Sequence, residues 1–173
     1  MNFLINNKII NYIIASIVPF LIWGPFLPDL IVSLSSLIFL FYVFKTNNFY
    51  HFEKTPFIIF LIFLLILVFS SLESTDISLS IKSSLAYFRI GVFSCFVWYL
   101  IEKDKSILKY FYYALIICFS TLMLDGYLQF FTGSNIVGLP KAGVRISSFF
   151  GDELIMGSYL SRLFPLLFAL LLV

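Results

Sequence analysis

The chain has 173 residues, of which 61% are hydrophobic and 20% aromatic, while 12% are charged. A soluble domain of this length has too little interior to bury so much apolar surface, so the composition excludes a soluble globular protein and predicts that lipid surrounds the chain. The net charge of +2 is too small to indicate a nucleic-acid partner, and a single histidine, His51, excludes a histidine-based metal cluster within the chain.

Apolar runs divide the chain into six predicted membrane-spanning helices. The first covers residues 9–26 and contains Pro19, which we expect to kink it. No small-residue cleavage site follows cleanly, so we interpret this run as a retained helix and not as a signal peptide. The other predicted spans are residues 30–44, 56–72, 83–101, 107–124 and 153–173. The prediction is therefore an all-α, polytopic protein that forms a single membrane domain over residues 1–173.

The last apolar run reaches Val173 without a polar or charged flank. Membrane helices usually end in interfacial residues. We therefore expect this chain to be the N-terminal part of a longer polytopic protein, and we expect the 173-residue piece to be inactive alone.

The distribution of basic residues predicts the orientation in the membrane. With a cytoplasmic N-terminus, six lysines fall on the cytoplasmic side and three basic residues fall on the opposite side. The cytoplasmic set is Lys8, Lys45, Lys54, Lys103, Lys105 and Lys109, and the opposite set is Lys82, Lys141 and Arg145. The positive-inside rule then favours a cytoplasmic N-terminus and places residues 126–152 on the outer face.

Residues 143–165, with the sequence G-V-R-I-S-S-F-F-G-D-E-L-I-M-G-S-Y-L-S-R-L-F-P, differ most from ordinary membrane-spanning sequence. Asp152 and Glu153 have the composition of a helix N-terminus, where carboxylates stabilise unpaired N–H groups. Gly157 and Ser161 are four residues apart, so they share a helix face that another helix can approach closely. An arginine inside an apolar segment, such as Arg162, is costly in lipid and often functional.

This segment resembles the central motif of the O-antigen ligase and O-antigen polymerase family of bacterial envelope enzymes. The matching residues, in order, are Arg145, Ser147, Ser148, Phe150, Gly151, Asp152, Gly157, Ser158, Tyr159 and Leu160. Just upstream, the sequence Y-L-Q-F-F-T-G at residues 127–133 is similar to the family's helix-end signature. Together these stretches cover about 40 residues, and the remainder is similar in hydropathy alone.

The resemblance implies a membrane glycosyltransferase that works at the periplasmic face of the bacterial inner membrane. Such an enzyme transfers a glycan from a polyprenyl-pyrophosphate-linked donor to an acceptor hydroxyl, either on a growing glycan or on lipid A core. The family needs no nucleotide, and we expect neither a cofactor nor a metal in this chain, so catalysis would rest on positioning and on charge stabilisation. The basic residue that the family uses lies in a later periplasmic loop, which His51, on the predicted cytoplasmic side, does not match.

Arg145 is the candidate charge stabiliser, because a guanidinium can hold pyrophosphate oxygens bidentately. The alternative is an interfacial arginine that anchors the loop to lipid headgroups. Arg162 and Arg89 are further substrate-binding candidates, and the alternative for both is a snorkelling or internally paired arginine. Asp125 could pair with one of them.

Gln129 and Asp152 complete the substrate-binding candidates, although Gln129 and its neighbour Tyr127 could equally pack inside the protein. Two other functions also fit the sequence. Intramembrane arginines and helices broken by Pro or Gly also suit a transporter or a lipid-linked oligosaccharide flippase. A non-catalytic membrane subunit is the third alternative.

Overall fold

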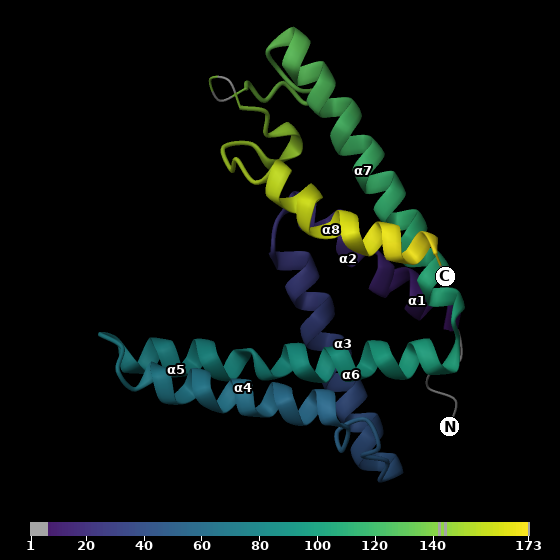
Figure 1. Ribbon diagram of the computed structural model, residues 1–173, viewed down its shortest axis with the longest axis vertical. Coiled ribbons are helices and arrows are strands. Elements are labelled where there is room, and N and C mark those ends of the chain that lie inside the picture. Colours follow the sequence, from purple (N-terminus) through teal and green to yellow (C-terminus); the bar gives the residue numbers. More distant parts are fainter. Residues whose placement is uncertain (1–6, 142, 144, 173) are drawn as a thin grey trace. The chain divides into compact units, whose positions relative to one another are not determined.

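A computed structural model describes residues 7–141, 143 and 145–172 of the chain. Those residues form α-helices and one short 3-10 helix and contain no β-strand, which confirms the predicted all-helical fold (Figure 1). The helices belong to two compact units. One combines the described residues up to Pro28 with those from Lys105 onward, and the other is Asp29–Asp104.

The first predicted span is interrupted in the structure. It consists of α1 (Asn7–Ala15) and α2 (Ile17–Trp23), which meet at Ser16. Pro19 explains the break, since it has no N–H to donate to the carbonyl of Ala15 and its ring crowds that carbonyl. The hydroxyl of Ser16 donates to the carbonyl of Ile13 at 2.7 Å, and its backbone keeps helical angles, with φ of −68° and ψ of −12°. The expected kink is therefore an interruption of one residue, and α2 ends three residues before the predicted boundary.

The helix that contains the predicted span 107–124, α7 (Ser106–Thr132), continues eight residues beyond it. Asp125, Gly126 and Gln129 lie on this continuation, and all three are buried. Gly133, with φ of 85°, ends α7 in the left-handed conformation that glycine adopts without steric cost. A helix of 27 residues is about 40 Å long, so α7 exceeds the thickness of a bilayer's hydrocarbon core.

A 3-10 turn, η1 (Ser148–Phe150), and the last helix, α8 (Met156–Leu171), complete the first unit. Figure 1 shows α8 beside α7. Their shared core consists of Val18 from α2 and of Leu115, Cys118, Phe119 and Leu122 from α7. Tyr159, Leu160 and Leu163 pack against it from α8. The start predicted at Glu153 is wrong, since Asp152 and Glu153 precede α8 and Ile155 holds the N-cap position.

The second unit contains α3 (Phe26–Thr46), α4 (Thr55–Ser71), α5 (Ile77–Ala86) and α6 (Phe88–Lys103). Figure 1 shows α4 alongside α5. The hydroxyls of Ser71 and Ser84, 2.6 Å apart, join these two helices. Asp76 caps α5 by accepting from the N–H of Leu79 at 3.0 Å, so a helix begins in the polar stretch before the predicted span 83–101.

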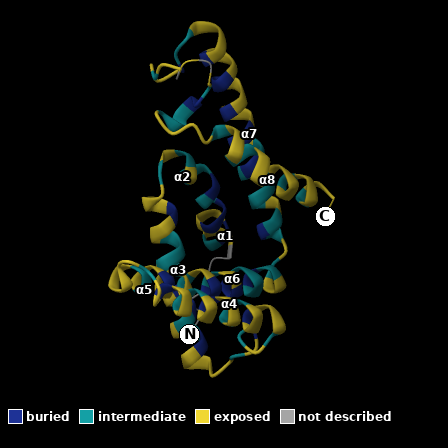
Figure 2. Cartoon of the chain, turned by 60° about the vertical axis from the view of Figure 1, so that its left-hand side comes forward, coloured by how far each residue is buried: buried dark blue, intermediate teal, exposed yellow. Residues whose placement is uncertain are grey.

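Among the described residues, three helical segments are long and apolar enough to cross a membrane: α3, the nearly continuous α5–α6 segment Ile77–Lys103, and α7. The segments Lys8–Trp23, Thr55–Ser71 and Met156–Leu171 are apolar but shorter. Exposed residues occur along the helices (Figure 2). They include large apolar ones, for example Phe41, Ile59 and Ile117. Such outward-facing apolar surface is compatible with a membrane protein.

Candidate functional site

The side chain of Gln129 makes hydrogen bonds to the backbone of the loop that carries the motif. Its side chain lies on the last turns of α7 and is fully buried. Its Oε1 accepts hydrogen bonds from the backbone N–H groups of Ser147, at 3.0 Å, and Ser148, at 2.8 Å. Its Nε2 donates to the carbonyl of Leu139 at 3.2 Å. One side chain therefore ties two distant parts of the loop to the end of α7.

Asp125, one helical turn earlier, adds a second anchor. Its Oδ1 accepts from the N–H of Ile136 at 2.9 Å, and its Oδ2 accepts from the hydroxyl of Ser148. Asn135 completes the network, because its Nδ2 donates to the carbonyl of Ser148 at 3.0 Å. The expected pairing of Asp125 with an arginine is therefore replaced by bonds to a serine and to a backbone N–H. These groups compensate a buried carboxylate without a cation.

Ser147 and Ser148 are the best-fixed residues of the motif. Both are fully buried, and Ser148 has a φ of 51°, which is uncommon for a residue with a side chain. The hydroxyl of Ser147 is buried and has no hydrogen-bond partner within the described residues. A strained backbone and an unpaired buried polar atom persist only where surrounding contacts hold them in place. The hydrogen bonds that Ser147 and Ser148 make with Gln129, Asp125 and Asn135 supply those contacts.

The other motif residues lie outside this network. Arg145, two residues before Ser147, is exposed, and so is Asp152. Arg162 is exposed as well, on the side of α8 away from the core residues Leu160 and Leu163. Within the residues that the structure describes, no hydrogen bond or ion pair brings Arg145, Asp152 and Arg162 together, and all three are exposed.

Arg89 belongs to the second unit and has an internal partner. Its guanidinium forms a bidentate ion pair with Asp29, in which Nη1 donates to Oδ2 at 2.9 Å. The same Nη1 donates to the hydroxyl of Ser33 at 2.9 Å. This arrangement links α6 to α3, so the structure favours the internally paired alternative for Arg89.

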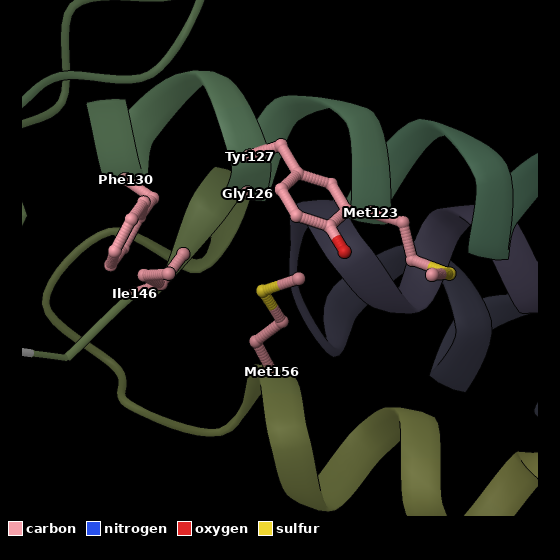
Figure 3. Close-up of a pocket in the computed structure, with 6 residues that line it drawn as sticks. All are labelled: Met123, Gly126, Tyr127, Phe130, Ile146 and Met156. Carbon is pink, nitrogen blue, oxygen red and sulfur yellow. The ribbon is translucent and has the colours of Figure 1, made fainter. Parts of the chain in front are cut away.

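A shallow apolar cavity of about 270 Å³ lies beside α7, between Ile146 of the loop and Met156 at the start of α8. Figure 3 shows the side chains that line it, namely those of Met123, Tyr127, Phe130, Ile146 and Met156, with Gly126 on the wall formed by α7. A Cβ at Gly126 would lie 2.8 Å from the terminal carbon of Met156, so glycine permits this close packing of α7 against the start of α8. Tyr127 is 62% exposed, so it contributes to the cavity and does not pack inside the core.

Tyr159 of the motif makes contacts that connect several helices. Its hydroxyl donates to the carbonyl of Val18 at 2.9 Å and lies 3.3 Å from the sulfur of Cys118. Its ring packs against Phe150 with centroids 5.4 Å apart. Tyr159 therefore joins α8 to α2, α7 and η1.

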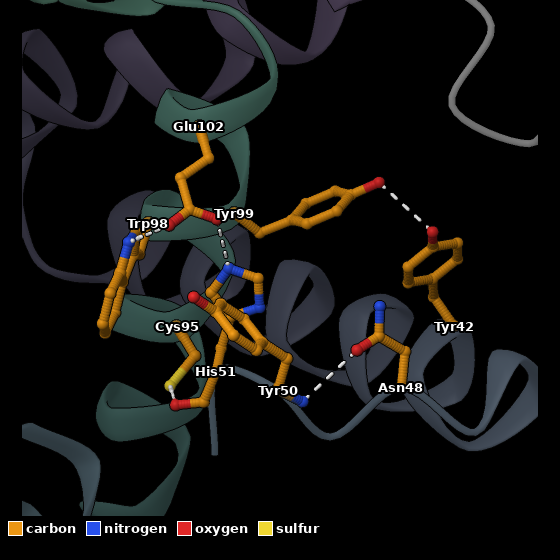
Figure 4. Close-up of polar contacts among 8 residues, drawn as sticks. All are labelled: Tyr42, Asn48, Tyr50, His51, Cys95, Trp98, Tyr99 and Glu102. Atoms are coloured by element: carbon orange, nitrogen blue, oxygen red, sulfur yellow. Dashed lines mark hydrogen bonds and ion pairs between the residues drawn. The ribbon is translucent and has the colours of Figure 1, made fainter. Parts of the chain in front are cut away.

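His51 forms a cluster in the second unit that sequence reasoning missed. It lies between the predicted spans 30–44 and 56–72, yet it is 6% exposed. Its Nε2 lies 3.0 Å from a carboxylate oxygen of Glu102, whose other oxygen accepts from the indole N–H of Trp98 at 2.7 Å (Figure 4). The rings of Trp98, Tyr99 and Tyr50 surround the imidazole. The only sequence signal was the spacing of Trp98 and Glu102 on one helix face.

Metal binding finds no support in the described part of the chain, where no group of three or more His, Cys, Asp or Glu side chains is placed to hold an ion. Comparison with models of protein families, with curated proteins and with solved structures yields no match to this chain.

Proposed function

We propose that this chain is part of an O-antigen ligase-like or polymerase-like glycosyltransferase of the bacterial inner membrane. It would act on a polyprenyl-pyrophosphate-linked glycan and transfer it to an acceptor hydroxyl in cell-surface polysaccharide or lipopolysaccharide synthesis. The structural support is the anchoring of the motif: Gln129 holds the backbone of Ser147 and Ser148, and Arg145 stands exposed just beside them. A fixed backbone presents a guanidinium with less loss of freedom when an anion binds.

The proposal includes six membrane spans with a cytoplasmic N-terminus. Three segments reach spanning length in the structure, and the three shorter ones have 16 or 17 residues, a length that a tilted or broken arrangement of neighbouring helices can accommodate. This topology puts the loop after α7, and with it Arg145, on the periplasmic side, where a lipid-linked donor presents its glycan.

The topology is tested by cysteine labelling. Cys95 and Cys118 are first replaced by serine, and single cysteines are then introduced at Asn48 and at Ser134. In intact cells with a permeabilised outer membrane, an impermeant thiol reagent should label position 134 and not position 48. The reverse pattern would place the motif in the cytoplasm and would exclude a periplasmic active site.

The function is tested by complementing a strain that lacks the gene. The readout is glycan transfer, normalised to the amount of protein in the membrane. Arg145→Ala should reduce transfer by about 10²-fold, the effect of removing one charge-stabilising contact. Arg145→Lys should retain part of the activity, because it keeps the charge but loses the fork geometry.

Lys141→Ala is the matched control, since Lys141 is an exposed cation of the same loop. It should transfer glycan like the parent. Normal transfer by a normally inserted Arg145→Ala protein would reduce Arg145 to an interfacial anchor and would remove the main support for this function.

A further inference from the structure

A tight turn with an apolar tip follows α7. The N–H of Gly138 donates to the carbonyl of Asn135 at 2.9 Å, which closes a turn around Ile136 and Val137. These two side chains are 72% and 68% exposed. Central positions of turns usually hold Gly, Pro, Asn, Asp or Ser, and each Å² of apolar surface left in water costs about 25 cal/mol. An exposed pair of β-branched residues at such a tip therefore indicates a non-aqueous contact.

The turn is held firmly from the inside. Asp125 accepts from the N–H of Ile136 at 2.9 Å, and the Asn135 side chain accepts from the N–H groups of Val137, at 3.1 Å, and Leu139, at 2.7 Å. Asp125 and Asn135 are both buried. The backbone of the tip is thus fixed by bonds directed inward while its two apolar side chains remain outside.

The surroundings of the tip favour lipid as the partner. α7 is long and apolar enough to span a bilayer, and it ends at Thr132, four residues before Ile136. Phe130 and Phe131 are exposed at that end, which is the composition of an interfacial aromatic belt. The same loop carries an exposed cation, Lys141, which complements the phosphates of lipid headgroups.

We propose that Ile136 and Val137 insert into the boundary between headgroups and acyl chains of the bilayer that α7 crosses, with Lys141 at the level of the lipid phosphates. This contact holds the loop flat against the membrane surface. It requires that α7 spans the bilayer, but it does not depend on glycan transfer.

The experiment uses tryptophan fluorescence of the purified protein in phospholipid nanodiscs. Trp23 and Trp98 are replaced by phenylalanine, and a single tryptophan is introduced at Ile136. Its emission should shift to shorter wavelengths in the nanodisc. Lipids brominated near the headgroup should quench it more than lipids brominated at the chain end, and aqueous iodide should quench it weakly.

Two control positions make the result decisive. Tryptophan at Glu153, an exposed polar position between η1 and α8, should be quenched by iodide more than by brominated lipid. Tryptophan at Ile117, exposed in the middle of α7, should be quenched best by bromine at the chain end.

Each other outcome overturns the proposal in a distinct way. Strong quenching at position 136 by iodide and none by brominated lipid would place the tip in water. Protection from both quenchers would mean that a protein surface, such as a second copy of the chain, covers the tip. An Ile117→Trp protein that brominated lipid does not quench would show that α7 does not span the bilayer, which removes the premise.

Discussion

The hydroxyl of Tyr159 donates a 2.9 Å hydrogen bond to the backbone carbonyl of Val18, 141 residues earlier in the sequence. This bond joins α8 to α2, two helices with apolar faces that pack on the same side chains of α7. Apolar packing by itself tolerates sliding between helices, whereas a directional hydrogen bond selects one alignment.

Tyr159→Phe should therefore lower stability while leaving the ring contact with Phe150 intact. The loss should be about 1 kcal/mol, the usual net contribution of one hydrogen bond. Thermal unfolding in detergent measures it. Tyr127→Phe is the control, because Tyr127 is 62% exposed, and it should unfold like the parent. Equal unfolding temperatures for both variants would mean that the bond to Val18 contributes no stability.

The second prediction concerns the anchor of the loop. Gln129→Met keeps the shape of the side chain but leaves the N–H groups of Ser147 and Ser148 without their acceptor, at a cost of about 1–3 kcal/mol for each buried group. The loop should loosen, and trypsin should cleave after Lys141 and Arg145 faster than in the parent. Met123→Leu, on the same helix, is the matched control. An unchanged cleavage rate for Gln129→Met would contradict the anchoring role.

Gly91 and Phe60 provide a third prediction, within the second unit. A Cβ at Gly91 would overlap a ring carbon of Phe60, so Gly91→Ala should force α4 and α6 apart and destabilise the protein by about 1–3 kcal/mol. Adding Phe60→Leu should restore part of the loss, since the two positions are in contact.

Gly157→Ala is the control for the Gly91 prediction. Nothing lies within 4 Å of a Cβ at Gly157, and alanine favours the helix by about 0.5–1 kcal/mol. This variant should be neutral or slightly stabilised in the same unfolding measurement. Identical responses of the two glycines would refute the close contact at Gly91.

The ion pair between Arg89 and Asp29 provides a fourth prediction. Arg89→Leu should leave the Asp29 carboxylate without its partner, and insertion and stability should both fall. The double variant Arg89→Leu/Asp29→Leu should be less impaired than Arg89→Leu alone, because it leaves no unpaired charge near lipid. The amount of folded protein in the membrane, measured by fluorescence-detected size-exclusion chromatography, compares them. A double variant that is worse than either single variant would show that the two residues act independently.

The sequence by itself determined that the chain is helical and suited to a membrane. Long apolar runs leave few other structures, because a backbone surrounded by lipid must satisfy its hydrogen bonds within each segment. The position of Pro19 also marked the weak point of the first span, since a missing N–H has the same local effect in any fold. These properties depend on near neighbours in the chain.

Tertiary structure alone decided where the polar residues act. The predicted span ended just before Asp125, yet α7 continues through Gln129, and the side chains of Asp125 and Gln129 bond to Ser147 and Ser148 about 20 residues later. Asp152 and Glu153 had the composition of a helix start, but the helix begins at Met156, where apolar contacts with α7 begin. Capping preferences are worth about 1 kcal/mol, and packing between distant segments outweighs them.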